Sequence, residues 1–153
     1  MQTITDAFFA GFLEGEGSFR CYEDKGSWRF SIELTQKRIE SLSYIQHTHG
    51  GTMYFNKNGF WSLRFSGVSS CSRVIKLTEN LLLAKRREAL AMSSAIKIVQ
   101  KSGASRVGQS ATLDRLCFSV IAMKGVNSRD DVGYGVPASA AQIEEYINRR
   151  DTA

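Results

Sequence analysis

The chain opens with a strongly apolar segment, residues 4–13, in which apolar side chains occupy almost every side of a helix. A helix that is apolar nearly all round has to be buried on two sides. Ala7 and Gly11 lie four residues apart, so their small side chains would let another backbone approach closely. We expect Gly15 and Gly17 to end this helix.

Two segments follow in which apolar and polar residues alternate, a pattern typical of strands with one buried and one wet face. Residues 18–34 carry Trp28, Phe30, Ile32 and Leu34 on one side, after a turn at residues 23–26. Residues 52–65 repeat the pattern, with Leu63 and Phe65 on the apolar side and a turn at residues 57–59. Each segment predicts an antiparallel hairpin.

Helical spacing of apolar residues returns between and after the hairpins. The two hairpins therefore predict an α+β layout, a four-stranded antiparallel sheet with helices on one face and extra C-terminal helices. We expect a single domain over residues 1–153, with a core at about 4–100 and a helical extension at about 101–153. The predicted helices cover residues 36–49, 69–83, 86–100, 112–123 and 139–149, with a loop at 125–137.

Composition favours a folded, basic, intracellular protein. The 153 residues are 42% apolar, and Lys plus Arg number 20 against 15 for Asp plus Glu, a net charge of +5 that favours a polyanionic partner. Cys21, Cys71 and Cys117 have no zinc-ligand spacing and are expected to be core residues in a reducing compartment. No apolar run approaches the roughly 20 residues that span a bilayer, and no signal peptide is evident, so no membrane partner is expected.

The polar positions of the hairpins would form one wet sheet face rich in hydrogen-bonding groups. Arginine suits guanine and asparagine suits adenine in the major groove, so this face could read base edges, with Arg38 near a strand end where phosphates would pass. An ordinary solvated sheet face is the alternative. The candidate DNA-binding positions are Ser18, Arg20, Tyr22, Ser27, Arg29, Ser31, Glu33, Arg38, Thr52, Tyr54, Asn56, Ser62 and Arg64.

Two acids, Glu14 and Glu16, stand at the end of the first helix on either side of Gly15. The helix dipole disfavours carboxylates there by roughly 0.3–1 kcal/mol. A hard divalent cation would remove this penalty, because Mg²⁺ takes carboxylate and carbonyl oxygens as ligands. The alternative is a helix end with two exposed acids.

The stretch FFAGFLEGEGSF, residues 8–19, resembles the LAGLIDADG motif of homing endonucleases. Ala10, Gly11 and Gly17 match the motif directly, while Glu14 and Glu16 stand for its two acids. The predicted order of elements is also similar to the αββαββα core of that family, with its saddle-like sheet. Only one copy of the motif is present, and single-motif members of the family form homodimers.

The resemblance implies roles for particular residues. Glu16 and the Gly15 carbonyl would bind Mg²⁺, with Mn²⁺ or Ca²⁺ able to occupy the same sites. Gln36 would order the attacking water and Lys85 would help to activate it or to stabilise charge, so Glu16, Gln36 and Lys85 are the candidate catalytic residues. The candidate dimer-interface residues are Ala7, Ala10, Gly11 and Glu14, of which Glu14 has a structural rather than a catalytic part.

The implied activity is that of a site-specific homing endonuclease, a homodimer that hydrolyses one phosphodiester per strand of a long, pseudo-palindromic double-stranded DNA site. Such an enzyme serves intron mobility in a bacterial, phage or organellar genome. Two alternatives use the same fold without cleavage, namely an intron maturase that assists RNA splicing and a DNA-binding protein that does not cut.

Overall fold

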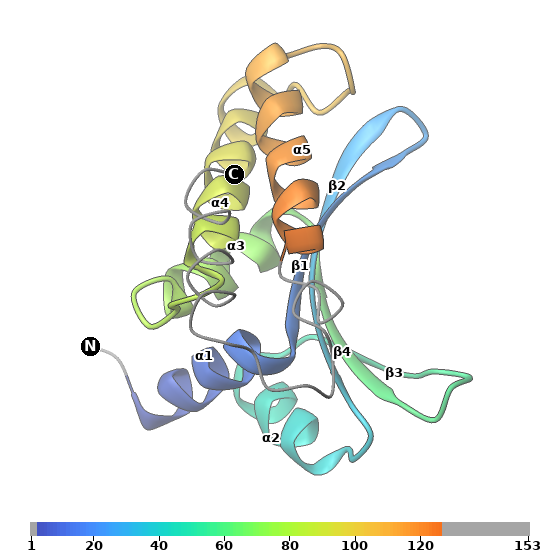
Figure 1. The fold of residues 1–153 in the computed structure, drawn as a ribbon, viewed down its shortest axis with the longest axis vertical. Coiled ribbons are helices and arrows are strands. Elements are labelled where there is room, and N and C mark those ends of the chain that lie inside the picture. The colour runs from blue at the N-terminus through green and yellow to red at the C-terminus, as the bar shows by residue number, and fades with distance from the viewer. Residues whose placement is uncertain (1–2, 127–153) are drawn as a thin grey trace, which may run out of the picture.

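The structure is a computed structural model of the chain and describes residues 3–126. It confirms the α+β prediction: the strands form one antiparallel sheet in the order β1-β2-β4-β3, and the helices lie on one side of it (Figure 1). The predicted helix at 139–149 and most of the loop at 125–137 lie outside the described residues. The elements are α1 (Ile4–Glu16), β1 (Gly17–Asp24), β2 (Ser27–Gln36), α2 (Glu40–His49), β3 (Thr52–Phe55), β4 (Trp61–Ser66), α3 (Val68–Thr78), α4 (Arg86–Ser102) and α5 (Ala111–Val126).

Helix α1 begins at a capping box and runs through Gly15, so the expectation that Gly15 would end it is wrong. Thr3 and Asp6 exchange side-chain and backbone hydrogen bonds at its start. At its end the N–H of Gly17 donates to the Leu13 carbonyl. A Cβ at residue 17 would lie 2.5 Å from the backbone carbonyl oxygen of Leu13, so only glycine fits where the chain turns from α1 into β1.

The two hairpins share β2 and β4 as the central pair of the sheet. Lys25 (φ 52°) and Gly26 (φ 82°) form the two-residue turn between β1 and β2, in the left-handed region that such hairpin turns require. Antiparallel pairing joins Gly17 to Leu34 in the first hairpin, while Gln36 of β2 pairs with Trp61 of β4. The start of β1, the end of β2 and the start of β4 therefore lie at the same end of the sheet.

The inner sheet face packs under all of the helices. Its buried apolar side chains come from β1, β2 and β4, while Met53 of β3 is partly buried against them. Helix α5 extends the core over the first hairpin, where Leu113 and Val120 are fully buried. The indole Nε1–H of Trp28 donates to Asp114 Oδ1 at 2.8 Å, which fixes α5 to β2. Among residues 3–126, no helix is long and apolar enough to cross a membrane.

The three cysteines are buried free thiols, as expected for core residues. A hydrogen bond with Cys117 and burial both raise the pKa of the Cys21 thiol. Burial raises the pKa of Cys71 to about 12. All three lie within the single hydrophobic core of the described residues.

Helix α3 ends at Thr78, five residues before the predicted end. The chain turns there, with the N–H groups of Leu81 and Leu82 both donating to the Thr78 carbonyl. This turn directs the chain towards the end of α1, where its backbone is bound by a glutamate described below. Helix α2 also starts later than predicted, at Glu40, because β2 continues to Gln36.

Candidate functional site

Glu14 is bound within its own chain. Its carboxylate oxygens accept hydrogen bonds from the backbone N–H of Leu83 at 2.9 Å and of Ala84 at 2.5 Å. Hydrogen bonds to an ionised carboxylate are stronger than neutral ones. Glu14 therefore ties the last turn of α1 to the segment that precedes α4, which agrees with a structural part for this acid.

Lys85, the residue before α4, reaches the same end of α1. Its ammonium donates to the Leu13 carbonyl at 3.2 Å, which also accepts the Gly17 N–H, and to the Gly17 carbonyl at 2.5 Å. Burial lowers the pKa of Lys85, while nearby carboxylates, Glu16 among them, act in the opposite direction. A cation is thus held in a fixed position at the end of the motif helix.

Glu16, the last residue of α1, is exposed, and its carboxylate makes no hydrogen bond or ion pair with any described residue. Gly15 lies in the same last turn, where carbonyl groups lack partners further along the helix. Carboxylate and carbonyl oxygens are the donors that hard divalent cations prefer. Within residues 3–126 no group of three His, Cys, Asp or Glu side chains could enclose a metal, so one chain fits such an ion only in part.

Gln36 lies at the same end of the sheet, two residues beyond Leu34, which pairs with Gly17. It lines a pocket of about 270 Å³ with Arg38, Glu40 and Ser41. Arg38 pairs with Glu40 at 3.1 Å, and hydrogen bonds from the Glu40 backbone N–H and from Arg38 lower the pKa of the Glu40 carboxyl. The strand register thus brings Glu16, Gln36 and Lys85 to one end of the sheet, although they are 20 or more residues apart in sequence.

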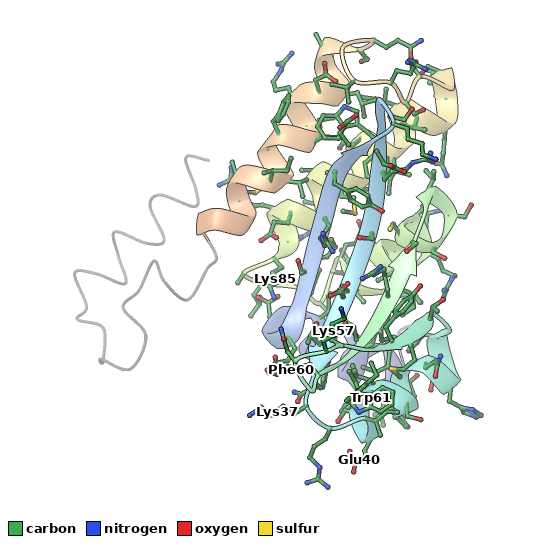
Figure 2. All side chains as sticks on the ribbon, turned by 90° about the vertical axis from the view of Figure 1, so that its right-hand side faces the viewer. Lys37, Glu40, Lys57, Phe60, Trp61 and Lys85 are labelled. Atoms are coloured by element: carbon green, nitrogen blue, oxygen red, sulfur yellow. The ribbon has the colours of Figure 1, made fainter. Side chains whose placement is uncertain are left out.

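The outer face of the sheet is open, with the strands in front and the helices behind in Figure 2. Glu33 stands at its centre and pairs with Arg64 at 2.9 Å and with Arg20 at 3.8 Å. Each arginine also lies over a tyrosine ring, Arg64 at 4.8 Å from the centre of Tyr54 and Arg20 at 5.7 Å from that of Tyr22. These contacts hold the arginine side chains flat along the face.

Two of the candidate DNA-binding residues are not open to solvent. Ser31 and Ser62 are on the outer face, as their strand pairing shows, but each is only 1% exposed. Their short side chains lie below longer neighbours on adjacent strands, and Ser62 Oγ accepts a hydrogen bond from Asn56 Nδ2 at 2.6 Å. The other candidates are exposed or half-buried: Ser18, Arg20, Tyr22, Ser27, Arg29, Glu33, Arg38, Thr52, Tyr54, Asn56 and Arg64.

Helix α1 presents an open side of small residues. Ala7, Gly11 and Gly15 are exposed, and a Cβ added at either glycine would meet no atom within 4 Å. Ala10 does not belong to this side, because it is 1% exposed and faces the core of its own chain with Phe9. The fold of the single chain thus buries Ala10, and its place at a subunit interface stays a prediction.

Lys37 and Phe60 were absent from the sequence-based site. The Lys37 ammonium lies 5.8 Å from the centre of the Phe60 ring, at the end of the sheet that holds Gln36. The alternation of residues 60–65 places Phe60 on the outer face, so the signal was present in the sequence. Phenylalanine offers no hydrogen bond to a base edge, so polarity alone does not mark this position as one that binds DNA.

The sequence profile described as LAGLIDADG endonuclease matches residues 9–99. Among solved structures, the homing endonuclease I-CvuI in complex with the I-CreI target in 2 mM Mg, with DNA not cleaved, superposes with a TM-score of 0.68. It is 18% identical, over 97% of this chain and 95% of that chain. No curated protein sequence matches the chain.

Two further structures extend the comparison. The archaeal intron-encoded homing endonuclease I-Vdi141I, complexed with DNA, has a TM-score of 0.69 and 14% identity over 97% of each chain. The meganuclease I-AabMI, bound to uncleaved DNA, has a TM-score of 0.63 and 17% identity over 91% of this chain but 48% of that one. Because the family profile spans more than half of the residues, and the motif helix, sheet order and fold agree with it, the chain belongs to the LAGLIDADG endonuclease family.

Proposed function

We propose that this protein is a divalent-metal-dependent endonuclease that acts as a homodimer on a long, nearly palindromic double-stranded DNA site and hydrolyses one phosphodiester in each strand. The observation that carries the proposal is the exposed Glu16 carboxylate, which has no partner among the described residues and ends the motif helix. It acts electrostatically on the anchored Lys85 ammonium, and the next residue, Gly17, begins strand β1 of the sheet.

The residues of the site fit the chemistry of phosphodiester hydrolysis. Glu16 and the Gly15 carbonyl would hold Mg²⁺, or Mn²⁺ or Ca²⁺, which when bound polarises the phosphate and lowers the pKa of a water molecule. Lys85 supplies positive charge close to where the attacked phosphate gains negative charge. The Gln36 amide, which can both donate and accept hydrogen bonds, would orient the attacking water.

Three observations support a homodimer. Residues 3–126 hold no group of three metal-ligand side chains, so a second copy would complete the site and address the second strand. The open side of α1, formed by Ala7, Gly11 and Gly15, is small enough to receive the same helix from a partner at close range. The chain also matches 97% of I-Vdi141I but 48% of I-AabMI, as a single unit would match one half of a double-length protein.

The outer sheet face would bind the DNA. The net charge of +5 per chain favours association with the phosphate backbone, and Arg20, Arg64 and Asn56 present donors suited to base edges. Glu33 keeps both arginines extended along the face until base acceptors replace it. Binding should weaken steeply with salt, because each phosphate contact releases counterions.

The test is to incubate the protein with Mg²⁺ and a library of long duplexes, and then to sequence the new DNA ends. We expect one recurrent, nearly palindromic cut site. Glu16→Gln should lower the cleavage rate at least about 100-fold, the scale on which a single catalytic interaction acts. The matched control is Glu23→Gln, which makes the same charge change at the far end of β1.

Equal cleavage by the wild-type and Glu16→Gln proteins would refute the metal assignment. Binding to a specific duplex without cleavage in any divalent cation would favour the non-cleaving DNA-binding protein. Dependence of RNA splicing on a protein that cuts no DNA would favour the maturase.

A further inference from the structure

The tip of the second hairpin carries an aromatic ring on the face that is otherwise polar. Ser62 and Arg64 alternate with Phe60 on the outer side of β4, and Asn56, which pairs with Phe60 across the turn, points its side chain to the same side at Ser62. The ring is half-buried, and the Lys37 ammonium lies 5.8 Å from its centre. Lys57 lies in the turn itself. Figure 2 shows Lys37, Lys57 and Phe60 towards the lower end of the sheet, with Lys85 above them.

The hairpin tip is built to hold this ring in place. The Asn56 N–H donates to the Phe60 carbonyl at 2.7 Å, and the three-residue loop closes with Gly59 in the left-handed region at φ 82°. On the opposite face of the same strands, the rings of Trp61 and Phe55 pack at 4.8 Å between centroids. Phe60 therefore projects from a short, closed turn that is supported from behind.

The ring lies close to the proposed cleavage centre. Phe60 stands at the level of Lys37, three residues beyond the Gly17–Leu34 pair and two strands across the sheet from β1. From strand geometry, Phe60 lies about 10 Å from Gly17 along the strands and about 10 Å from it across the sheet, a distance of about 14 Å in all. At a rise of about 3.4 Å per base pair, the ring is within about four base pairs of a phosphate at Glu16.

We propose that Phe60 is a wedge that packs against a base step close to the cleaved phosphate and partly unstacks it, while Lys37 and Lys57 hold the flanking phosphates. Phenylalanine is one of the apolar residues that proteins insert at base steps to kink a duplex. A ring with a cation against its face can meet the bases while its neighbours neutralise the backbone. Phe60 would then be a positioning residue, and this assignment rests on the proposed endonuclease function.

The probe is the duplex that the protein retains best from a random library, remade with single 2-aminopurine substitutions moved one position at a time along it. The fluorescence of 2-aminopurine rises when the base unstacks. Glu16→Gln protein is used, so that no cleavage occurs during the measurement. We expect a rise at one or two adjacent positions near the centre of the site, lost in Glu16→Gln/Phe60→Ala and kept in Glu16→Gln/Phe60→Trp.

The matched control is Phe118→Ala, which removes a 56% exposed phenylalanine ring from α5, on the helical side of the sheet, and should leave the fluorescence change intact. Affinity for the duplex should fall about tenfold in Phe60→Ala, the size of a lost base–aromatic contact. A mismatch at the responding step should restore most of that loss, because the step is already unstacked. This rescue separates a wedge from a variant that folds poorly.

The inference is wrong if the protein binds the duplex and no position responds, or if Phe60→Ala and wild type give the same profile. It is also wrong if the mismatch fails to rescue Phe60→Ala. In each of these cases the wild-type protein can still cut its site, so the proposed function stands. A protein that retains no duplex would overturn both.

Discussion

The two sides of helix α1 have opposite characters within the same thirteen residues. On one side Phe9 and Leu13 are fully buried, whereas on the other Gly11 and Gly15 have open space beside them. The two acids of its last turns differ in the same way, because Glu14 binds two backbone N–H groups of a distant segment and Glu16 makes no hydrogen bond with a described residue.

Helix α1 thus contains residues that the chain needs in order to fold and residues that it keeps available. Phe9, Leu13 and Glu14 have partners within the chain, so these residues account for stability. Gly11, Gly15 and Glu16 leave a smooth helix surface and a carboxylate that a single folded chain has no reason to require. The motif therefore divides folding and function between different residues of one helix.

The largest expected effect tests the inner side. Leu13→Ala should lower the free energy of unfolding by about 2–5 kcal/mol, because it leaves a cavity in a well-packed core. The control is Leu90→Ala on α4, where Leu90 is 42% exposed. This substitution should change the free energy of unfolding by about 0.5 kcal/mol or less. Urea denaturation measures both, and similar losses at the two positions would break the distinction.

The outer side is tested by Gly11→Leu. The added side chain meets nothing within its own chain, so the subunit should stay folded, whereas a partner helix at close range would be displaced. Overpacking costs about 1–3 kcal/mol and occurs twice in a symmetric interface, so the dimer dissociation constant should rise at least about 30-fold. Sedimentation measures the association state, with Ser94→Leu on the exposed face of α4 as the control. An unchanged dimer would show that α1 is not its interface.

The two acids of the motif should respond in opposite directions. Glu14→Ala should destabilise the protein by about 1–3 kcal/mol, since it removes the acceptor of two hydrogen bonds. Glu16→Ala should leave stability unchanged or raise it by about 0.3–1 kcal/mol, because a carboxylate at a helix C-terminus opposes the dipole. Matched denaturation curves decide the question, and a loss at Glu16 equal to that at Glu14 would contradict this division.

The smallest effect concerns pH. Burial lowers the pKa of Lys85 below its ordinary value of 10.5, so the folded chain loses that proton before the unfolded chain does. In the interval between the lowered pKa and 10.5 the unfolded state binds more protons, and stability due to Lys85 rises with pH. The free energy of unfolding of the wild type, measured relative to Lys85→Met, should therefore increase as the solution is made alkaline. If the difference in the free energy of unfolding between the two proteins does not change with pH, the pKa of Lys85 is not lowered in the folded chain.

The periodic parts of the fold followed directly from the sequence. Alternation placed Phe30, Ile32 and Leu34 on the buried face, and the turn chemistry at Lys25–Gly26 set the first hairpin. Local reasoning failed where a distant segment intervened: α1 continues through Gly15 because Leu83, Ala84 and Lys85 provide hydrogen-bond partners at its end. No local signal links these residues to the motif.

The sequence predicted the kinds of residue that form the candidate site, but not which of them are exposed or how they are arranged. The alternation assigned Ser31 and Ser62 to the outer face, but burial depends on the length of neighbouring side chains on other strands, which strand periodicity does not contain. Ala10 is as small as Ala7, but tertiary packing decides which side of the helix faces the core, and Ala10 is on that side. The location of Gln36, Lys85 and Glu16 at one end of the sheet depends on strand register and on the path of the chain after α3.

The chain's two tryptophans stand at opposite ends of the sheet, and this makes them separate optical reporters. Trp28 is 4% exposed and donates its indole hydrogen to Asp114, so its emission follows the attachment of α5. Trp61 is half-buried beside Phe60 at the hairpin tip. A Trp28→Phe protein would leave Trp61 as the sole indole fluorophore, and quenching of that signal as duplex is added would record the arrival of DNA at the hairpin tip in real time, without any label.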